Sequence, residues 1–124
     1  MTLPTTLRFG GTTVEVWSDC TRVTLPSGGT VVGAPQDNDA YRAAALRLGY
    51  GADTAAMSRE HEVGHAALCH FLGLPCSPVM STVAGEPVGD VVTHWLEEEA
   101  VMAVQRLARA VGVDLVEVWK RTDA

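Results

Sequence analysis

The chain has 124 residues, of which 47% are hydrophobic and 19% are charged, and its formal net charge is −6. These values are typical of one soluble globular domain with a modest core. Nine Lys and Arg residues stand against fifteen Asp and Glu residues, and the basic residues do not cluster. The composition therefore argues against a surface that binds nucleic acid directly.

The start of the chain has no apolar leader, and no apolar run approaches the length of a membrane span. Cys20, Cys69 and Cys76 are odd in number and lack paired spacing, which fits reduced thiols better than a disulfide framework. We therefore expect a cytoplasmic protein that has no membrane segment.

Residues 7–34 have the pattern of β structure. Apolar and polar side chains alternate over residues 12–17, and turn sequences lie at Gly10-Gly11 and at residues 26–29. The pattern predicts two hairpins, or one antiparallel sheet of three to four strands.

The rest of the chain has mainly helical patterns. The predicted helices cover about 39–48, 54–73, 90–111 and 114–121. The first carries an apolar stripe from Tyr41 to Leu48 that should pack beside the second, Asp90 is a suitable N-cap for the third, and residues 79–83 fit a short edge strand. We expect a single α+β domain over residues 1–124, with a small sheet packed on a helical core.

The stretch from Ser58 to His70 contains the pattern His-Glu-x-x-His. In a helix that Ser58 caps, residues four apart are offset by about 40°, so His61 and His65 present two imidazoles from one face. Two neutral imidazoles in this arrangement can bind one Zn²⁺ ion. Glu62 lies about 100° from His61 around the helix, in the position of a general base that holds a metal-bound water.

A catalytic zinc site needs a third protein ligand besides two histidines. His70 is five residues after His65 and points about 100° away from it, so we do not expect it to bind the metal. The helix over 90–111 is the better source, because it carries His94 and three consecutive glutamates.

The apolar stripe of this helix orients its glutamates. The stripe consists of Leu96, Ala100, Ala103, Val104, Leu107 and Val111. If this stripe is the buried face, Glu98 points away as a solvated charge, Glu99 lies on a flank, and Glu97 approaches the motif helix. His94, one turn before Glu97, is an alternative ligand, a partner that orients a ligand, or a donor to the transition state, and Glu99 also stays open as the third ligand.

The sequence His61-Glu62-Val63-Gly64-His65, followed by Glu97-Glu98-Glu99-Ala100 on the later helix, resembles the zincin core of the ImmA/IrrE-type metallopeptidases. The resemblance covers roughly residues 58–108. It implies a gluzincin-type site in which His61, His65 and Glu97 bind zinc and Glu62 is the general base.

We therefore expect a small zinc-dependent metallopeptidase that hydrolyses a peptide bond in a protein or peptide substrate. A metal-activated water would attack, Glu62 would move its proton, and His94 or Tyr50 would stabilise the oxyanion. The alternative is a metal-binding or metal-free interaction protein on the same scaffold, without turnover. A DNA-associated regulator is a third hypothesis, which the acidic charge opposes.

Overall fold

The computed structural model describes residues 3–73 and 91–122, with residues 91–95 described by their backbone alone. In this part of the chain, four strands precede four helices. The strands are β1 (Thr5–Phe9), β2 (Thr12–Val16), β3 (Thr21–Thr24) and β4 (Thr30–Gly33). The helices are α1 (Asp39–Leu48), α2 (Thr54–Leu72), α3 (Val91–Val111) and α4 (Leu115–Lys120). The predicted α+β fold is confirmed.

The strands form one antiparallel sheet in the order β1-β2-β3-β4. Leu7, Val14 and Val23 are direct neighbours across β1, β2 and β3, and all three side chains are buried. Because alternate residues of a strand point to the same face, this row gives the sheet one apolar face. Gly10 makes the tight β1–β2 turn with a φ of 61°, a conformation that suits glycine.

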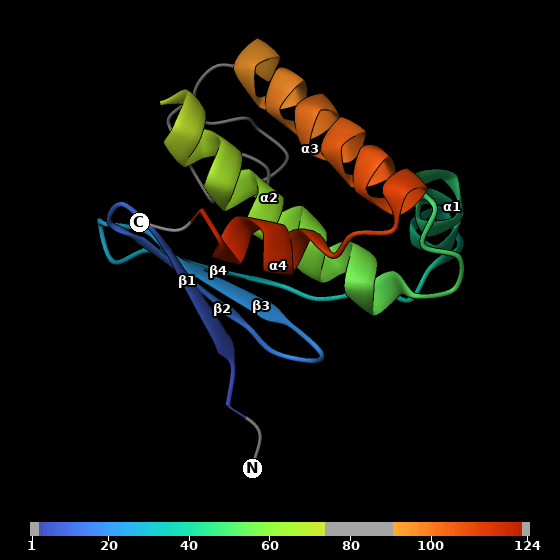
Figure 1. The fold of residues 1–124 in the computed structure, drawn as a ribbon, viewed down its shortest axis with the longest axis horizontal. Helices are drawn as coiled ribbons and strands as arrows, with labels where there is room; N and C mark the ends of the chain where they lie inside the picture. Colours follow the sequence, from blue (N-terminus) through green and yellow to red (C-terminus); the bar gives the residue numbers. More distant parts are fainter. Residues whose placement is uncertain (1–2, 74–90, 123–124) are drawn as a thin grey trace.

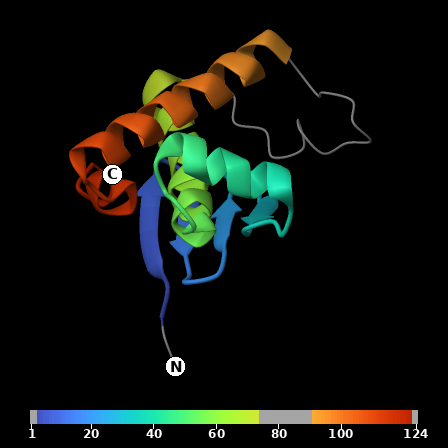
Figure 2. The ribbon, with the colours of Figure 1, turned by 90° about the vertical axis from the view of Figure 1, so that its right-hand side faces the viewer.

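Helix α2 lies between the sheet on one side and α3 on the other (Figures 1 and 2). Its Val63, Ala66 and Ala67 pack against the apolar face of the sheet, and Val116 of α4 completes this core. Helix α1 packs against α2 through a second cluster that includes Leu48 and Met57, as its predicted stripe requires. Helix α2 is therefore the central element, and its face toward α3 is the place where polar side chains can meet.

Helix α2 begins one turn before Ser58. Asp53 is its N-cap, and the Asp53 carboxylate accepts a hydrogen bond of 3.0 Å from the backbone N–H of Ala56. Ser58 is buried inside the helix, so the prediction that it caps the helix is wrong. The reason is that the residues between Asp53 and Ser58 include good helix formers, which let the helix start at the earlier of two suitable caps. The helix ends at Gly73 with a φ of 68°, as predicted.

Helix α3 buries a different face from the predicted one. Among residues 96–111 of this helix, Val101, Gln105 and Ala108 are buried, whereas Leu96 and Leu107 of the predicted stripe are 66% and 64% exposed. The physical reason lies in the partner helix, because α2 presents imidazoles as well as apolar groups to α3. The polar side chains of α3 therefore turn inward, and part of its apolar stripe is left at the surface.

Three features of the sequence lie outside the described residues: Cys76, the predicted edge strand at 79–83 and the predicted cap Asp90. Within the described residues, no helix is both long enough and apolar enough to span a membrane.

The β4 strand pairs with β3 and forms one edge of the described sheet.

Candidate metal centre

His61 and His65 project from the same face of α2 toward α3. Their ring centroids are 4.7 Å apart, and their Nε2 atoms are separated by 3.1 Å. Both side chains are largely buried, at 22% and 14% exposure. Helical spacing alone brings these rings together, as the four-residue repeat predicts.

Glu98 of α3 completes a group of three donor side chains. Its Oε1 atom lies 3.1 Å from the Nε2 of His61 and also contacts the Nε2 of His65. The donor atoms of these three residues all lie within 4.8 Å of one another. The prediction that Glu98 is a solvated charge is therefore wrong, because it assumed that the leucine stripe of α3 is buried.

Glu97 contacts the site at a different atom. One oxygen of its carboxylate contacts the Nδ1 of His65, and the other accepts a hydrogen bond of 3.1 Å from the thiol of Cys69. Glu97 thus approaches α2, as the sequence predicts. The Glu97 carboxylate, however, faces the outer nitrogen of His65, whereas the Glu98 carboxylate faces both inner nitrogens.

Two of the three donor separations suit a tetrahedral metal ion, and the third, between the Nε2 of His65 and the Oε1 of Glu98, is a direct contact. Two ligands at ordinary zinc distances, about 2.1 Å from the ion, lie about 3.4 Å from each other in a tetrahedral site. Both the Nε2–Nε2 separation and the separation of the His61 Nε2 from the Glu98 Oε1 are 3.1 Å. Two imidazoles and one carboxylate form a common ligand set of catalytic zinc, which also keeps a position for water.

Gln105 fixes the tautomer of His61. Its Nε2 donates hydrogen bonds to the carbonyl of Met57 at 3.0 Å and to the hydroxyl of Tyr50 at 3.1 Å. Since a backbone carbonyl can only accept, the amide nitrogen must lie on that side, and the amide oxygen faces the Nδ1 of His61 at 2.8 Å. The Nδ1 of His61 must therefore carry a hydrogen, and in the neutral ring the Nε2 has a lone pair aimed at the three-donor group.

Glu97 orients His65 in the same way. A carboxylate can accept the Nδ1 hydrogen of His65, so the Nε2 of His65 also points at the common centre. Two lone pairs 3.1 Å apart would repel each other unless a cation, a proton or a metal ion, lies between them. The partners of both imidazoles therefore favour the binding of a cation at this point. Outer partners of this kind are usual for histidines that bind metals.

Opposing effects act on the protonation of His65 and Glu98 before a metal binds. Burial lowers the pKa of His65, but the carboxylates of Glu97 and Glu98 outweigh burial and raise the pKa to about 10. Burial raises the pKa of Glu98, but hydrogen bonds and charge from the two histidines outweigh it and hold the pKa well below its usual range. Without metal, a proton on His65 is the cation that the group holds.

Zinc binding is therefore expected to release protons. At neutral pH the ion must displace the proton of His65, so zinc affinity should rise about tenfold per pH unit between about pH 6 and pH 8. Titration calorimetry in buffers of different ionisation enthalpy measures the released protons. The Glu97→Gln variant removes one cause of the raised pKa and should show a weaker dependence, whereas binding without proton release would contradict the expectation.

The other residues predicted for the site have separate positions. Glu62 lies against Gly33 of β4, and its carboxylate is outside the three-donor group of the described residues. His94 lies in α3, and its side chain is outside the described residues. His70 is exposed and its ring lies tilted beside that of Phe9, with ring centroids 6.2 Å apart, as expected for a histidine that does not bind the metal.

Tyr50 serves the site indirectly. Its ring is only 7% exposed, it belongs to the apolar cluster between α1 and α2, and its hydroxyl accepts the hydrogen bond from Gln105. Burial raises the pKa of Tyr50 above its usual range, so the phenol keeps its proton. Tyr50 therefore positions Gln105, and its buried hydroxyl is bound there, whereas the sequence analysis expected Tyr50 or His94 to stabilise the oxyanion.

Gln105 is the site residue that the sequence analysis missed. The signal was its spacing, because Glu98, Val101, Gln105 and Ala108 follow one another at intervals of three and four residues. A glutamine in such a stripe is fully buried only when its amide is hydrogen bonded, which points to polar partners on the facing helix.

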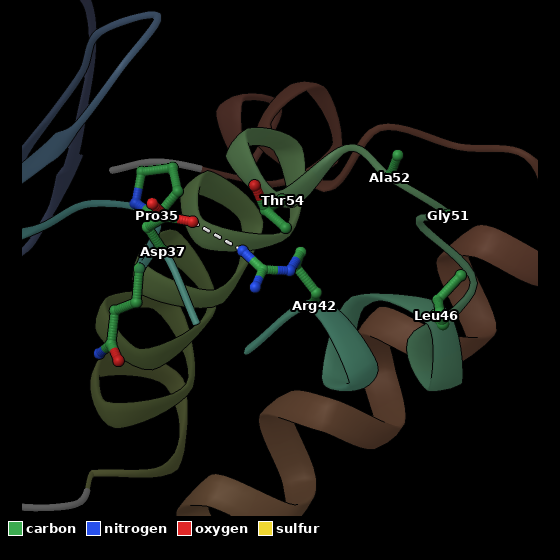
Figure 3. A pocket seen from close by; sticks show the side chains of 8 residues that line it. Pro35, Asp37, Arg42, Leu46, Gly51, Ala52 and Thr54 are labelled. Carbon is green, nitrogen blue, oxygen red and sulfur yellow. Dashed lines mark hydrogen bonds and ion pairs between the residues drawn. The ribbon is translucent and has the colours of Figure 1, made fainter. Parts of the chain in front are cut away.

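A pocket of about 360 Å³ lies between the loop before α1, α1 itself and the start of α2 (Figure 3). Arg42 enters it, and its guanidinium forms ion pairs of 2.6 Å with Asp37 and with Asp39. These carboxylates balance the charge of Arg42, and the histidines of α2 do not line the pocket. We therefore place the candidate site at the three-donor group.

Comparison with known proteins returns no match for this chain among protein-family models, curated proteins or solved structures. The function must therefore be argued from the geometry of the site itself.

Proposed function

We propose that the protein is a zinc-dependent metallopeptidase. The observation that carries this proposal is the convergence of the His61 and His65 Nε2 atoms and the Glu98 carboxylate on one point, with each imidazole oriented by its own outer partner. We place Glu98 as the third ligand in preference to Glu97, because Glu98 faces both Nε2 atoms. Glu97 then acts as the residue that orients His65.

In the proposed mechanism the zinc ligands, Glu62 and His94 have separate roles. Zinc bound by the three donors would polarise the scissile carbonyl and lower the pKa of a water molecule. Glu62, next to His61 in the motif, takes the proton of the attacking water and passes it to the leaving amine. Stabilisation of the oxyanion by His94 stays a prediction from the sequence.

The edge of the sheet offers a place for an extended peptide. Strand β4 is at the edge of the described sheet, and its last residue, Gly33, contacts Glu62. An extended segment can pair with such an edge through main-chain hydrogen bonds. A peptide on β4 would lie beside the general base, which supports a peptide or protein substrate.

Gly33 is expected to control the position of Glu62. A Cβ atom at residue 33 would lie 2.6 Å from the Cγ of Glu62 and 2.8 Å from its Oε1. The Gly33→Ala variant should therefore displace the carboxylate and lower turnover by about 10²-fold, while zinc binding stays unchanged. Peptidase assays and zinc titration together measure the two effects.

Gly29→Ala is the matched control for this variant. Residue 29 lies in the turn before β4, and a Cβ there would meet the hydroxyl of Ser27 at an ordinary 3.6 Å. The control should retain native turnover. Native turnover in Gly33→Ala itself would show that Glu62 acts from another position or is not the base.

The direct test of the proposal measures metal content and cleavage in the same preparation. Protein purified without chelators should contain zinc near one ion per chain and should cut members of a peptide library. Chelation should abolish cleavage and added zinc should restore it. A preparation that binds no zinc, also after incubation with the ion, would overturn the proposal, as would a fully zinc-loaded protein that cuts no peptide.

We also propose a cytoplasmic location, because the cysteines that the structure describes are thiols. Cys69 donates a hydrogen bond to Glu97 through its sulfur, which requires the reduced form. A reducing compartment keeps such a thiol available to hold Glu97 in place.

A further inference from the structure

Helix α3 carries an apolar surface on the side away from α2. We name this surface the outer stripe of α3; it consists of Leu96, Ala100, Ala103, Leu107 and Ala110. Leu96 and Leu107 are 66% and 64% exposed, and Ala103 and Ala110 are exposed as well. In Figure 1, α3 lies on the far side of α2 from the sheet, and within the described residues the leucines of the outer stripe are exposed.

The residue spacing of the outer stripe is that of a coiled-coil seam. Successive members are separated by four, three, four and three residues, so they stay on one side of the helix over four turns. A seam of this kind packs against another helix when it is not covered within its own chain. In the described part of the chain, the covered side of α3 is the opposite one, around Val101 and Gln105.

The outer stripe is complementary to an antiparallel copy of itself. If two α3 helices pack antiparallel about an axis near residues 101 and 102, Leu96 of each copy meets Leu107 of the other. In the same register Ala100 meets Ala103, and small side chains at the centre let the helices approach closely. The large side chains then cover the two ends of the contact.

The charges beside the outer stripe agree with this register. Glu99 and Arg106 are both exposed, lie seven residues apart on the same flank, and have no ion-pair partner among the described residues. In the antiparallel arrangement each Glu99 faces Arg106 of the other copy, which gives two opposite-charge pairs. In a parallel arrangement this flank would meet the opposite flank, which carries the apolar Val104.

We propose that the outer stripe of α3 is a homodimer interface, in which two copies of the chain pack their α3 helices antiparallel. The apolar seam supplies the contact area, and the pairs of Glu99 with Arg106 select the direction. The metal donors face α2 on the other side of α3, so the interface does not include them.

Sedimentation of the full chain and of charge variants tests the proposal. The native chain should associate with a dissociation constant of about 10–100 µM, as expected for one pair of helices. E99R and R106E should each weaken association by about tenfold, since each places two like-charge pairs in the dimer. The E99R/R106E double variant should recover native association.

Mixing the two single variants makes the test specific for direction. E99R carries two positive charges on the flank and R106E two negative ones, so a mixture should form heterodimers about as tightly as the native chain associates. Leu107→Glu should weaken association by about 100-fold, whereas Leu3→Glu, at a leucine that is 80% exposed before β1, should leave it unchanged.

Several outcomes would overturn the proposal. A native chain that stays monomeric at about 1 mM excludes the homodimer and leaves the stripe for another partner. If Leu107→Glu does not change association, the outer stripe is not the dimer interface. Single variants that do not form heterodimers exclude the antiparallel register. All variants are at exposed positions, and unchanged circular dichroism and zinc content confirm that they fold.

Discussion

The Glu62→Gln variant is expected to bind zinc as tightly as the native protein and to hydrolyse peptides about 10³-fold more slowly. Glutamine has nearly the shape of glutamate, so the contact with Gly33 and the packing of α2 should persist. It cannot take a proton from the attacking water, however, and this transfer is the step that Glu62 performs in the proposed mechanism. Turnover should fall while metal binding stays constant.

The comparison of metal content with turnover separates an enzyme from a metal-binding protein without catalysis. His61→Ala is the matched control, because it removes a zinc ligand and should lose both properties. If Glu62→Gln retained the turnover of the native protein, Glu62 would not be the base. If neither the native protein nor the variant cut any peptide while both held zinc, the site would be structural.

Local patterns were sufficient to predict the order of the elements. The alternation around Val14, the glycines of the turns and the stop of α2 at Gly73 are all set within a few positions of the chain. For the same reason the pairing of His61 with His65 needed only the helical repeat. Both histidines belong to one helix, and their separation is fixed before any other element packs.

The partner of these histidines could not be predicted in this way. It depends on the rotation of α3 about its axis, and the rule that the apolar stripe is buried gave the wrong face. The face that is buried instead contains Glu98 and Gln105, whose polar atoms are matched by the imidazoles and the Met57 carbonyl of α2. Polar side chains can be buried only where hydrogen-bond partners face them, and the partners of Glu98 and Gln105 on α2 lie 33 to 48 residues away in the sequence.

This rotation also accounts for the surface of α3. The leucines that the sequence analysis placed in the core belong to the opposite side of the helix, where they form the outer stripe. The apolar side chains on the exposed face of α3 bury little surface against their own chain, so this face contributes little to the stability of the monomer. The proposed dimer and the proposed metal centre therefore arise from the same feature, the turn of Glu98 and Gln105 toward α2.

Three adjacent glutamates of α3 allow the third ligand to be identified by matched substitutions. Glu98→Gln should raise the dissociation constant for zinc by about 10²–10³-fold, since it replaces a charged ligand with a neutral amide. Glu97→Gln should raise it by about 10–100-fold, because Glu97 orients His65 without binding the ion. Glu99→Gln, on the exposed flank, should leave zinc binding unchanged.

The spectrum of the cobalt-substituted protein distinguishes a lost ligand from a lost outer partner where the affinities overlap. Glu98→Gln changes the ligand set, so the visible absorption of bound Co²⁺ should change in position and intensity. Glu97→Gln leaves the three donors in place, so its spectrum should match that of the native protein although the ion binds more weakly. The reverse pattern would make Glu97 the ligand, as the resemblance to the ImmA/IrrE-type metallopeptidases implies. In that case His65 would have to present its Nδ1 to the metal. The tautomer that Gln105 imposes on His61 would still hold, but the tautomer inferred for His65 from Glu97 would not.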